Sequence, residues 1–217
     1  MQILVFEDNL LNQKLIEQRL KSWGCLVHVT DDAKYGLNIL ENNNIDLVFM
    51  DLRMPIMNGF EVTRKIRSSR NTYVSQIPII ALTADFSIKD KEQCRDNGIN
   101  DYILKPYSPD ELLMKLTSNR AEMKMNDMIA SRIGDPSREI INDETPKIDL
   151  KIILEECMGE LDLLEELISL YKQNAFEFIG KVKHYLKLKD FKNIQFAAHK
   201  IKSGLAMMQT FSLHSIV

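Results

Sequence analysis

Short apolar runs alternate with longer amphipathic stretches along residues 1–118. Each run is too short for a helix, whereas the stretches between the runs carry apolar residues at helical spacing. Strands that are buried on both faces of a parallel sheet give continuous apolar runs of this kind. The pattern therefore predicts an α/β fold with a doubly wound, five-stranded parallel sheet. The predicted strands are 3–6, 26–30, 46–50, 78–82 and 102–104, and the predicted helices are 9–22, 32–43, 59–69, 88–97 and 109–118.

The pattern changes after residue 118, where no further strand is indicated. We expect a short helical piece at 149–157 and two longer helices at 161–186 and 191–208. Apolar residues recur every three or four positions along the whole of 161–186, as they do in a helix that packs in a bundle. These residues are Leu161, Leu164, Ile168, Tyr171, Ala175, Phe178, Val182 and Leu186.

Two domains are expected in the 217 residues: an α/β domain at 1–118 and an all-α helical bundle at 146–217, joined by a partly helical linker at 119–145. Gly134 and Pro136 interrupt the helical pattern within this linker. Only nine residues follow Met208, which is too little chain to finish a four-helix bundle, so we expect the bundle to be C-terminally incomplete. Either a second chain completes it as a homodimer, or this half is loosely folded.

Composition narrows the classes of partner. The formal net charge of -3 gives no basic excess for a phosphate backbone, so we expect no nucleic acid. No apolar run approaches the roughly 18 residues of a membrane span, so we expect no membrane contact by this segment. The cysteines Cys25, Cys94 and Cys157 are widely spaced and match no metal-ligand pattern or disulfide set, which favours a reducing cytoplasmic location.

Five side chains suited to phosphoryl chemistry follow the ends of the predicted strands. The carboxyl ends of parallel strands share one rim of the sheet, so these side chains should converge there. Carboxylate oxygens suit Mg²⁺, while an ammonium and a hydroxyl group can bind an anionic oxygen. The cluster therefore predicts a magnesium-dependent phosphoryl site with Asp51 as the nucleophile. Its members are Glu7 and Asp8 after the first strand, Asp51 after the third, Thr83 after the fourth and Lys105 after the fifth.

The sequence around these five residues resembles the motifs of response-regulator receiver domains. The matching stretches are 6–9 (FEDN), 50–59 (MDLRMPIMNG), 82–84 (LTA) and 104–106 (LKP). The resemblance covers residues 1–118 and implies a flavodoxin-like fold, phosphorylation of Asp51 and a cis peptide before Pro106. It further implies a role for each residue of the cluster: Asp8, Asp51 and the main-chain carbonyl of Arg53 hold magnesium with help from Glu7, and Thr83 and Lys105 bind the phosphoryl oxygens.

A second candidate lies on the predicted helix 191–208. The apolar stripe of that helix consists of Ile194, Ala197, Ile201, Leu205 and Met208. At about 100° per residue, His199 falls nearly opposite this stripe, so it is predicted to face water. An exposed histidine is most often an ordinary surface residue, so the neighbouring residues decide whether His199 is only that or has a functional role. Lys202 lies one turn on and can neutralise a phosphoryl group on the ring. Gly204 weakens a helix by about 1 kcal/mol relative to alanine, which suggests a steric reason for its place.

The stretch 197–204 (AAHKIKSG) resembles the signature of histidine-containing phosphotransfer domains, which are four-helix bundles. The resemblance implies that His199 carries a phosphoryl group. Ser203 and Gly204 depart from that signature, because the family more often has glycine followed by serine or alanine there.

Together the two resemblances predict a phosphorelay segment that passes a phosphoryl group between Asp51 and His199. Since a strand starts directly after Met1 and the bundle is incomplete, we expect a piece of a hybrid sensor histidine kinase. The chain has no room for an ATP-binding kinase domain, so it is a phosphotransfer protein in itself. The expected partners are a sensor histidine kinase, upstream or in the same polypeptide, and a downstream response-regulator receiver; the direction of transfer stays open.

Three alternatives remain from the sequence. The chain is a standalone relay protein, or a non-catalytic interaction module whose site is degenerate, or a small-molecule enzyme that uses Asp51 as its nucleophile. The intact residues Asp51, Lys105 and His199 count against the interaction module. The short connections between the predicted elements count against the enzyme, because they leave no insertion to cover a substrate.

Overall fold

The structure is a computed structural model that describes residues 1–83, 88–123, 153–155 and 157–207. Within these ranges it leaves out the side chains of residues 88–90, 119–123, 199, 203, 206 and 207. The predicted linker 119–145 therefore lies outside the described residues except for its first five positions. In the described part, no helix is long and apolar enough to cross a membrane.

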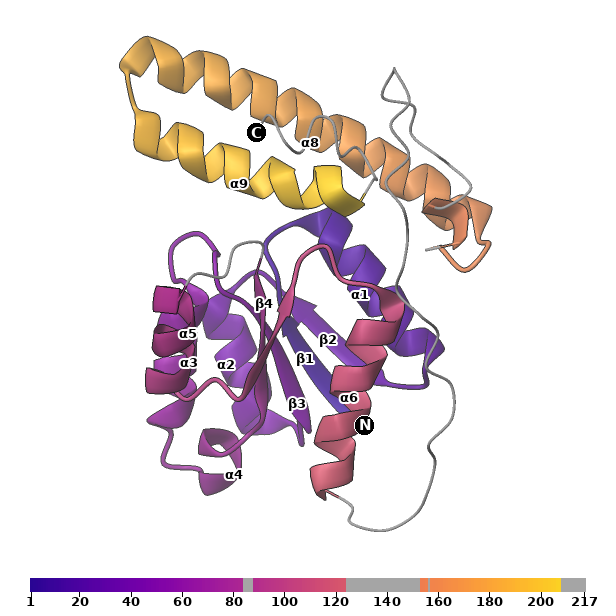
Figure 1. The fold of residues 1–217 in the computed structure, drawn as a ribbon, viewed down its shortest axis with the longest axis vertical. Helices are drawn as coiled ribbons and strands as arrows, with labels where there is room; N and C mark the ends of the chain where they lie inside the picture. Colours follow the sequence, from indigo (N-terminus) through magenta and orange to yellow (C-terminus); the bar gives the residue numbers. More distant parts are fainter. Residues whose placement is uncertain (84–87, 124–152, 156, 208–217) are drawn as a thin grey trace.

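The first half is a five-stranded parallel sheet with helices on both faces (Figure 1). The strand order is β2-β1-β3-β4-β5, so the doubly wound parallel sheet that the sequence predicts is confirmed. All neighbouring strands pair in parallel: β1 lies between β2 and β3, and β4 lies between β3 and β5. The elements are β1 Gln2–Phe6, α1 Leu10–Ser22, β2 Leu26–Thr30, α2 Ala33–Asn42, β3 Leu47–Asp51, α3 Gly59–Arg67, α4 Thr72–Ser75, β4 Ile79–Thr83, α5 Ile88–Asp96, β5 Asp101–Leu104 and α6 Pro109–Met123.

Two apolar clusters hold the helices on the sheet. Side chains alternate between the two faces of a strand, so Leu4 and Phe6 join the cluster of α2, α3 and α5, whereas Ile3 and Val5 join that of α1 and α6. All four are fully buried. This burial on both faces is the reason that the strands read as unbroken apolar runs in the sequence.

Side-chain caps fix where several helices begin. Asn9 caps α1 by accepting from the Leu11 N–H, and Asp32 caps α2 in the same way through two N–H groups. Asn58 and Glu61 form a reciprocal capping box at the start of α3. Each predicted helix of the first half is present within a few residues of its predicted bounds, and α6 runs five residues beyond the predicted end. The four-residue helix α4 was not predicted.

The second half contributes a pair of helices, α8 Leu161–Leu188 and α9 Phe191–Met207, that lie across the first half (Figure 1). Lys189, in the left-handed conformation, ends α8 and begins the short turn into α9. On α9 the predicted stripe is confirmed at Ala197, Ile201 and Leu205, which are all buried. The four-helix bundle itself stays a prediction.

The predicted apolar face of α8 is wrong at both ends. Leu161 and Leu186 are 63% and 55% exposed, and along α8 the buried residues are Leu163, Leu164 and Leu167. These three pack with Leu11 and Leu15 of α1, together with Ile153 and Cys157, in a third apolar cluster. The reason is that α8 packs across α1 near its own N-terminus, so the sequence periodicity of one isolated helix misplaces the buried side.

Gly59 allows α3 to start against β3. A Cβ atom at this position would lie 2.4 Å from the main-chain oxygen of Asp51 and 2.9 Å from the Cα of Leu52. Since backbone atoms cannot swing aside, Gly59→Ala is expected to lower the free energy of unfolding by about 1–3 kcal/mol in urea titrations. Gly180→Ala is the matched control, because nothing lies within 4 Å of its added Cβ atom. It should instead stabilise α8 by up to about 1 kcal/mol, and equal effects of the two changes would contradict the argument.

Candidate functional site

Three carboxylates meet at the carboxyl-terminal edge of the sheet. Glu7 and Asp8 follow β1, and Asp51 is the last residue of the neighbouring strand β3. Each can offer one oxygen such that these atoms all lie within 4.8 Å of one another. Glu7 and Asp51 are 1% and 5% exposed, so this negative charge is largely withdrawn from water. Such a cluster is stable only with cations among its members.

Lys105 supplies one of those cations from the end of β5. Its Nζ atom lies 2.6 Å from Asp51 Oδ2 and 2.5 Å from Glu7 Oε2, and the side chain is 6% exposed. The other Asp51 oxygen, Oδ1, accepts from the Arg53 N–H at 2.8 Å. Both oxygens of Asp51 are thus held in place by residues of the first half of the chain.

The protonation of the cluster reflects burial and mutual charge. Burial, together with the Asp51 charge and against the opposing effect of Lys105, raises the pKa of Glu7 to about 7. Burial and the Asp51 charge also raise the pKa of Asp8, with Lys200 and Lys105 acting in the opposite direction. Burial by itself lowers the pKa of Lys105, but Asp51 and Glu7 outweigh it, so the pKa is raised and the ammonium group stays charged.

The oxygen atoms of this cluster fit a magnesium ion. Asp8 Oδ2 is buried and accepts no hydrogen bond from any described residue. Glu7 Oε1, in contrast, accepts hydrogen bonds from the Asn9 N–H and from Asn12 Nδ2, so protein donors already occupy this oxygen. A buried oxygen without a donor, beside two further carboxylates, is suited to a hard divalent cation.

The remaining predicted residues of the first half lie close by. Thr83 is the last residue of β4 and is 2% exposed, and its carbonyl accepts from the Lys105 N–H at 2.7 Å. The peptide bond between Lys105 and Pro106 is cis, as the family resemblance implies. The structure therefore brings Glu7, Asp8, Asp51, Thr83 and Lys105 to one edge of the sheet, with Arg53 at its margin.

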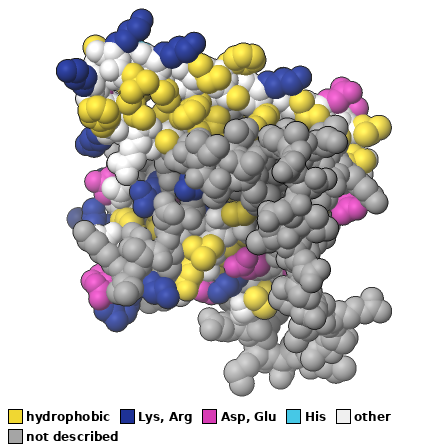
Figure 2. All heavy atoms as spheres, turned by 45° about the horizontal axis from the view of Figure 1, so that its top comes forward, with side chains coloured by type: hydrophobic (Ala, Val, Ile, Leu, Met, Phe, Trp, Pro, Cys, Tyr) yellow, Lys and Arg dark blue, Asp and Glu magenta, His cyan; other side chains and the backbone are white. Residues whose placement is uncertain are grey.

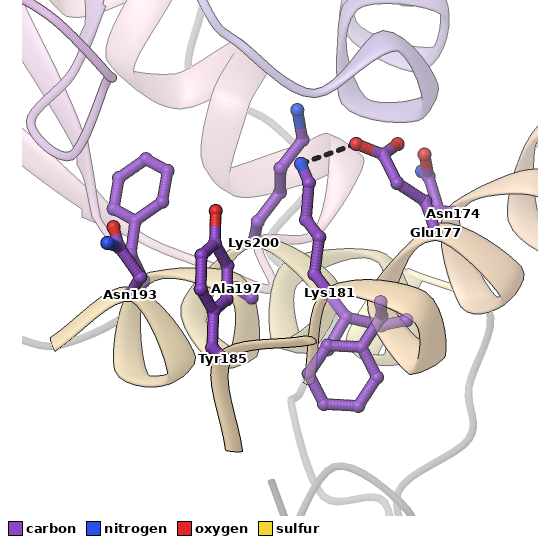
Figure 3. A pocket seen from close by; sticks show the side chains of 10 residues that line it. Asn174, Glu177, Lys181, Tyr185, Asn193, Ala197 and Lys200 are labelled. Carbon is purple, nitrogen blue, oxygen red and sulfur yellow. Dashed lines mark hydrogen bonds and ion pairs between the residues drawn. The ribbon is translucent and has the colours of Figure 1, made fainter. Parts of the chain in front are cut away.

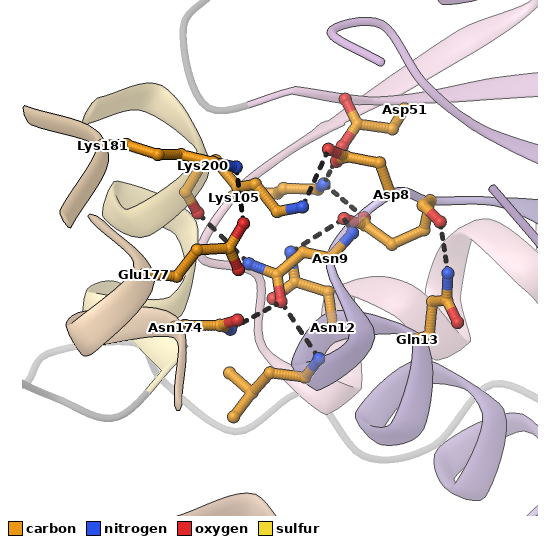
Figure 4. Close-up of polar contacts among 12 residues, drawn as sticks. Asp8, Asn9, Asn12, Gln13, Asp51, Lys105, Asn174, Glu177, Lys181 and Lys200 are labelled. Carbon is orange, nitrogen blue, oxygen red and sulfur yellow. Dashed lines mark hydrogen bonds and ion pairs between the residues drawn. The ribbon is translucent and has the colours of Figure 1, made fainter. Parts of the chain in front are cut away.

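Residues of the second half also reach this edge, and the sequence did not indicate them. Lys200 of α9 places its Nζ atom 3.7 Å from Asp8 Oδ2. Asn9 links three elements: its Nδ2 donates to the Lys200 carbonyl at 3.1 Å, and its Oδ1 accepts from Asn174 Nδ2 of α8 at 3.3 Å (Figure 4). The one available signal was the place of Asn9 directly after two acidic residues at a strand end.

The predicted histidine lies on α9, but its side chain is outside the described residues. The exposure of His199 therefore stays a prediction. Lys202 is half-buried, and its support of a phosphorylated ring is also untested. Gly204 is buried, and a Cβ atom there would lie 3.8 Å from Leu11 Cδ2 and 3.9 Å from Asn9 Nδ2. Both are ordinary van der Waals distances, so the described residues would accommodate an alanine here, and the steric reason expected for this glycine stays a prediction.

Comparison with known proteins assigns the first half of the chain to a family. The family model described as response regulator receiver domain matches residues 3–117, which is more than half of the chain. The chain belongs to the response regulator receiver family. The receiver domain of a sensor histidine kinase from Pseudomonas aeruginosa, solved with a magnesium ion coordinated in its active-site cleft, is 38% identical with a TM-score of 0.50. The match covers 54% of this chain and 94% of that structure.

Curated relatives of the receiver include hybrid kinases. Hybrid signal transduction histidine kinase I of Dictyostelium discoideum is 39% identical over 112 residues, which cover 49% of this chain and 6% of the relative. Sensor histidine kinase RcsC of Escherichia coli is 33% identical over 117 residues, covering 54% of this chain and 12% of the relative. The transcriptional regulatory protein HprR of E. coli is 31% identical, with 61% and 56% covered. The chain thus spans about half the length of one relative and a small part of the others.

Proposed function

We propose that this chain is the receiver and phosphotransfer segment of a two-component phosphorelay, in which Asp51 accepts a phosphoryl group and His199 carries it onward or back. The observation that carries the proposal is the contact of the buried Lys105 ammonium with both Asp51 and Glu7, beside the Asp8 oxygen that accepts no hydrogen bond from a described residue. The hybrid kinases among the relatives support an origin in a hybrid sensor histidine kinase.

The receiver's own residues divide the chemistry among them. A carboxylate oxygen of Asp51 attacks the phosphorus of the donor, and the bond from phosphorus to the donor's leaving group, a histidine nitrogen or the acetate of acetyl phosphate, breaks as the new bond forms. The Arg53 N–H orients the carboxylate. Lys105 and the Thr83 hydroxyl bind the phosphoryl oxygens and keep them in place. Magnesium would be held by Asp8, Asp51 and the Arg53 carbonyl with assistance from Glu7, and when bound it supplies positive charge that offsets the incoming phosphoryl group.

The second half supports the relay role through its sequence and its position. The stretch around His199 resembles a phosphotransfer signature, and α9 lies against the receiver at Asp8 and Asn9. Lys202 would neutralise the phosphoryl group on the histidine. The proposed partners are a sensor histidine kinase and a downstream receiver. The contacts of Asp51 with Lys105 favour this function over an interaction module with a degenerate site.

Phosphate mapping tests the proposal. The chain is incubated with acetyl phosphate and magnesium, and the acid-labile and base-labile phosphate is located by mass spectrometry. We expect base-labile phosphate on Asp51 and acid-labile phosphate on His199, with the second lost in His199→Gln and the first retained. His184→Gln, which alters an exposed histidine of α8, should leave both signals unchanged. Acid-labile phosphate that persists in His199→Gln would exclude His199 as the carrier.

A further inference from the structure

Lys200 brings a second ammonium group to the acidic cluster, and it comes from the other half of the chain. Its Nζ atom lies 3.7 Å from Asp8 Oδ2, the buried oxygen that accepts no hydrogen bond from a described residue. The Asp8 side chain is 8% exposed, so solvent screens this interaction less than it screens a surface ion pair. The oxygen best placed for a metal ion thus already faces a protein cation.

The main chain of α9, and not only a long flexible side chain, is held at this place. Asn9 is 2% exposed and binds the Lys200 carbonyl with its Nδ2 atom while its Oδ1 atom accepts from Asn174. One turn further on, Gly204 passes so near Leu11 and Asn9 that an added Cβ atom would lie within 4 Å of both. The backbone of α9 is therefore anchored directly beside Asp8, at the residue that follows it in the sequence.

An apolar seam anchors α8 to the same helix of the receiver. Leu11 and Leu15 of α1 are 0% and 9% exposed, and they pack with Leu163, Leu164 and Leu167. Lys14 lies between the two leucines in the sequence and pairs with Glu166 at 3.0 Å across the seam. Burial of apolar surface favours this contact, and the polar contacts fix its register.

The groove between α8 and α9 supplies an internal comparison for Lys200. It has a volume of about 190 Å³, and the side chains of both Lys181 and Lys200 line it (Figure 3). Lys181 pairs with Glu177 of its own helix at 2.5 Å, whereas Lys200 pairs with the receiver. Lys181 therefore offers the same ammonium group as Lys200 in the same groove, but it forms no ion pair with Asp8. On the outward side of the two helices, apolar side chains cover much of the surface (Figure 2).

We propose that the α8–α9 pair covers the phosphoacceptor edge of its own receiver, and that Lys200 lowers the receiver's affinity for magnesium. This inference rests on the proposed magnesium site. Two cations that share the Asp8 carboxylate repel each other, so the docked ammonium group weakens magnesium binding. By linkage, magnesium weakens the docking of α9 to the same extent, and metal binding loosens the cover.

Magnesium titration of the full chain by calorimetry, without a phosphodonor, tests the role of Lys200. Lys200→Met keeps the apolar stem and removes the charge, and it should tighten magnesium binding about three- to tenfold, as for a partly screened ion pair. Lys181→Met is the matched control and should bind like the unaltered chain. Equal affinity of Lys200→Met and the unaltered chain would overturn the proposal while leaving the proposed function intact. Absence of magnesium binding in all of them would overturn both.

A second pair of variants separates docking from charge. Gly204→Ala fits, because its Cβ atom would make ordinary contacts, whereas the longer side chain of Gly204→Gln has to push α9 away from α1. Both changes favour the helix, so loss of helix stability does not confuse the result. Gly204→Gln should speed hydrogen exchange in residues 161–171 and tighten magnesium binding, and Gly204→Ala should do neither. Faster exchange in Gly204→Gln with unchanged magnesium affinity would refute the proposal that docking of the α8–α9 pair weakens magnesium binding.

Discussion

Asp51→Asn is expected to take up no phosphate from acetyl phosphate in the presence of magnesium, a loss of at least about 100-fold relative to the unaltered chain. The amide has the size of the carboxylate but is not a nucleophile, and it withdraws one of the negative charges that face Lys105. Glu7 does not replace it, since its two oxygens are occupied by Asn12, Lys105 and the Asn9 N–H.

The labelling is measured by intact mass at a fixed time, with Asp110→Asn as the control. Asp110 is an exposed aspartate in the first turn of α6, so its change should leave the uptake unchanged. A chelator should abolish the uptake in the unaltered chain as well. Undiminished labelling of Asp51→Asn would mean that another residue is the phosphoacceptor.

Lys105→Met is expected to give the largest loss of stability, about 3–5 kcal/mol of the free energy of unfolding in the presence of a chelator. The change removes the cation from between two buried carboxylates and leaves their charge uncompensated. Added magnesium should restore part of this stability, because a ligand that binds the folded state stabilises it. Urea titrations with and without magnesium measure both effects.

Lys115→Met is a control of equal geometry and different burial. Lys115 lies 2.6 Å from Asp101, the same distance as Lys105 from Asp51, but these side chains are 25% and 34% exposed. Solvent therefore screens the pair, and its loss should lower the free energy of unfolding by at most about 1 kcal/mol. If Lys105→Met and Lys115→Met lower the free energy of unfolding equally, burial does not make the ion pairs of Lys105 more stabilising than an exposed pair.

The sequence predicted the elements of the first half well because their signals are local. Burial on both faces makes each strand a continuous apolar run, and caps such as Asn58 and Ser108 lie within three residues of the N–H groups that they bind. The helix α4 was missed because four residues are too few to show a period. On α8 the predicted face was wrong at Leu161 and Leu186, since its partner α1 is distant in the sequence.

The acidic cluster was predictable for a different reason. In a parallel sheet every strand points the same way, so residues at the strand ends meet whatever the details of packing. Glu7, Asp8, Asp51, Thr83 and Lys105 all follow this rule. Lys200, Asn174 and the linking role of Asn9 follow no such rule, because they depend on where a second group of helices docks.

By itself, then, the sequence determined the doubly wound sheet, the converging carboxylates with Lys105, and the candidate histidine on a helix. Each of these depends on periodicity, on strand direction or on a short motif, which are properties of neighbouring residues. Only the tertiary structure decided that α8 and α9 lie on α1 and that Lys200 reaches Asp8. Contacts between residues about 190 positions apart arise from the shape and charge of two folded surfaces, and no local pattern in the chain encodes them.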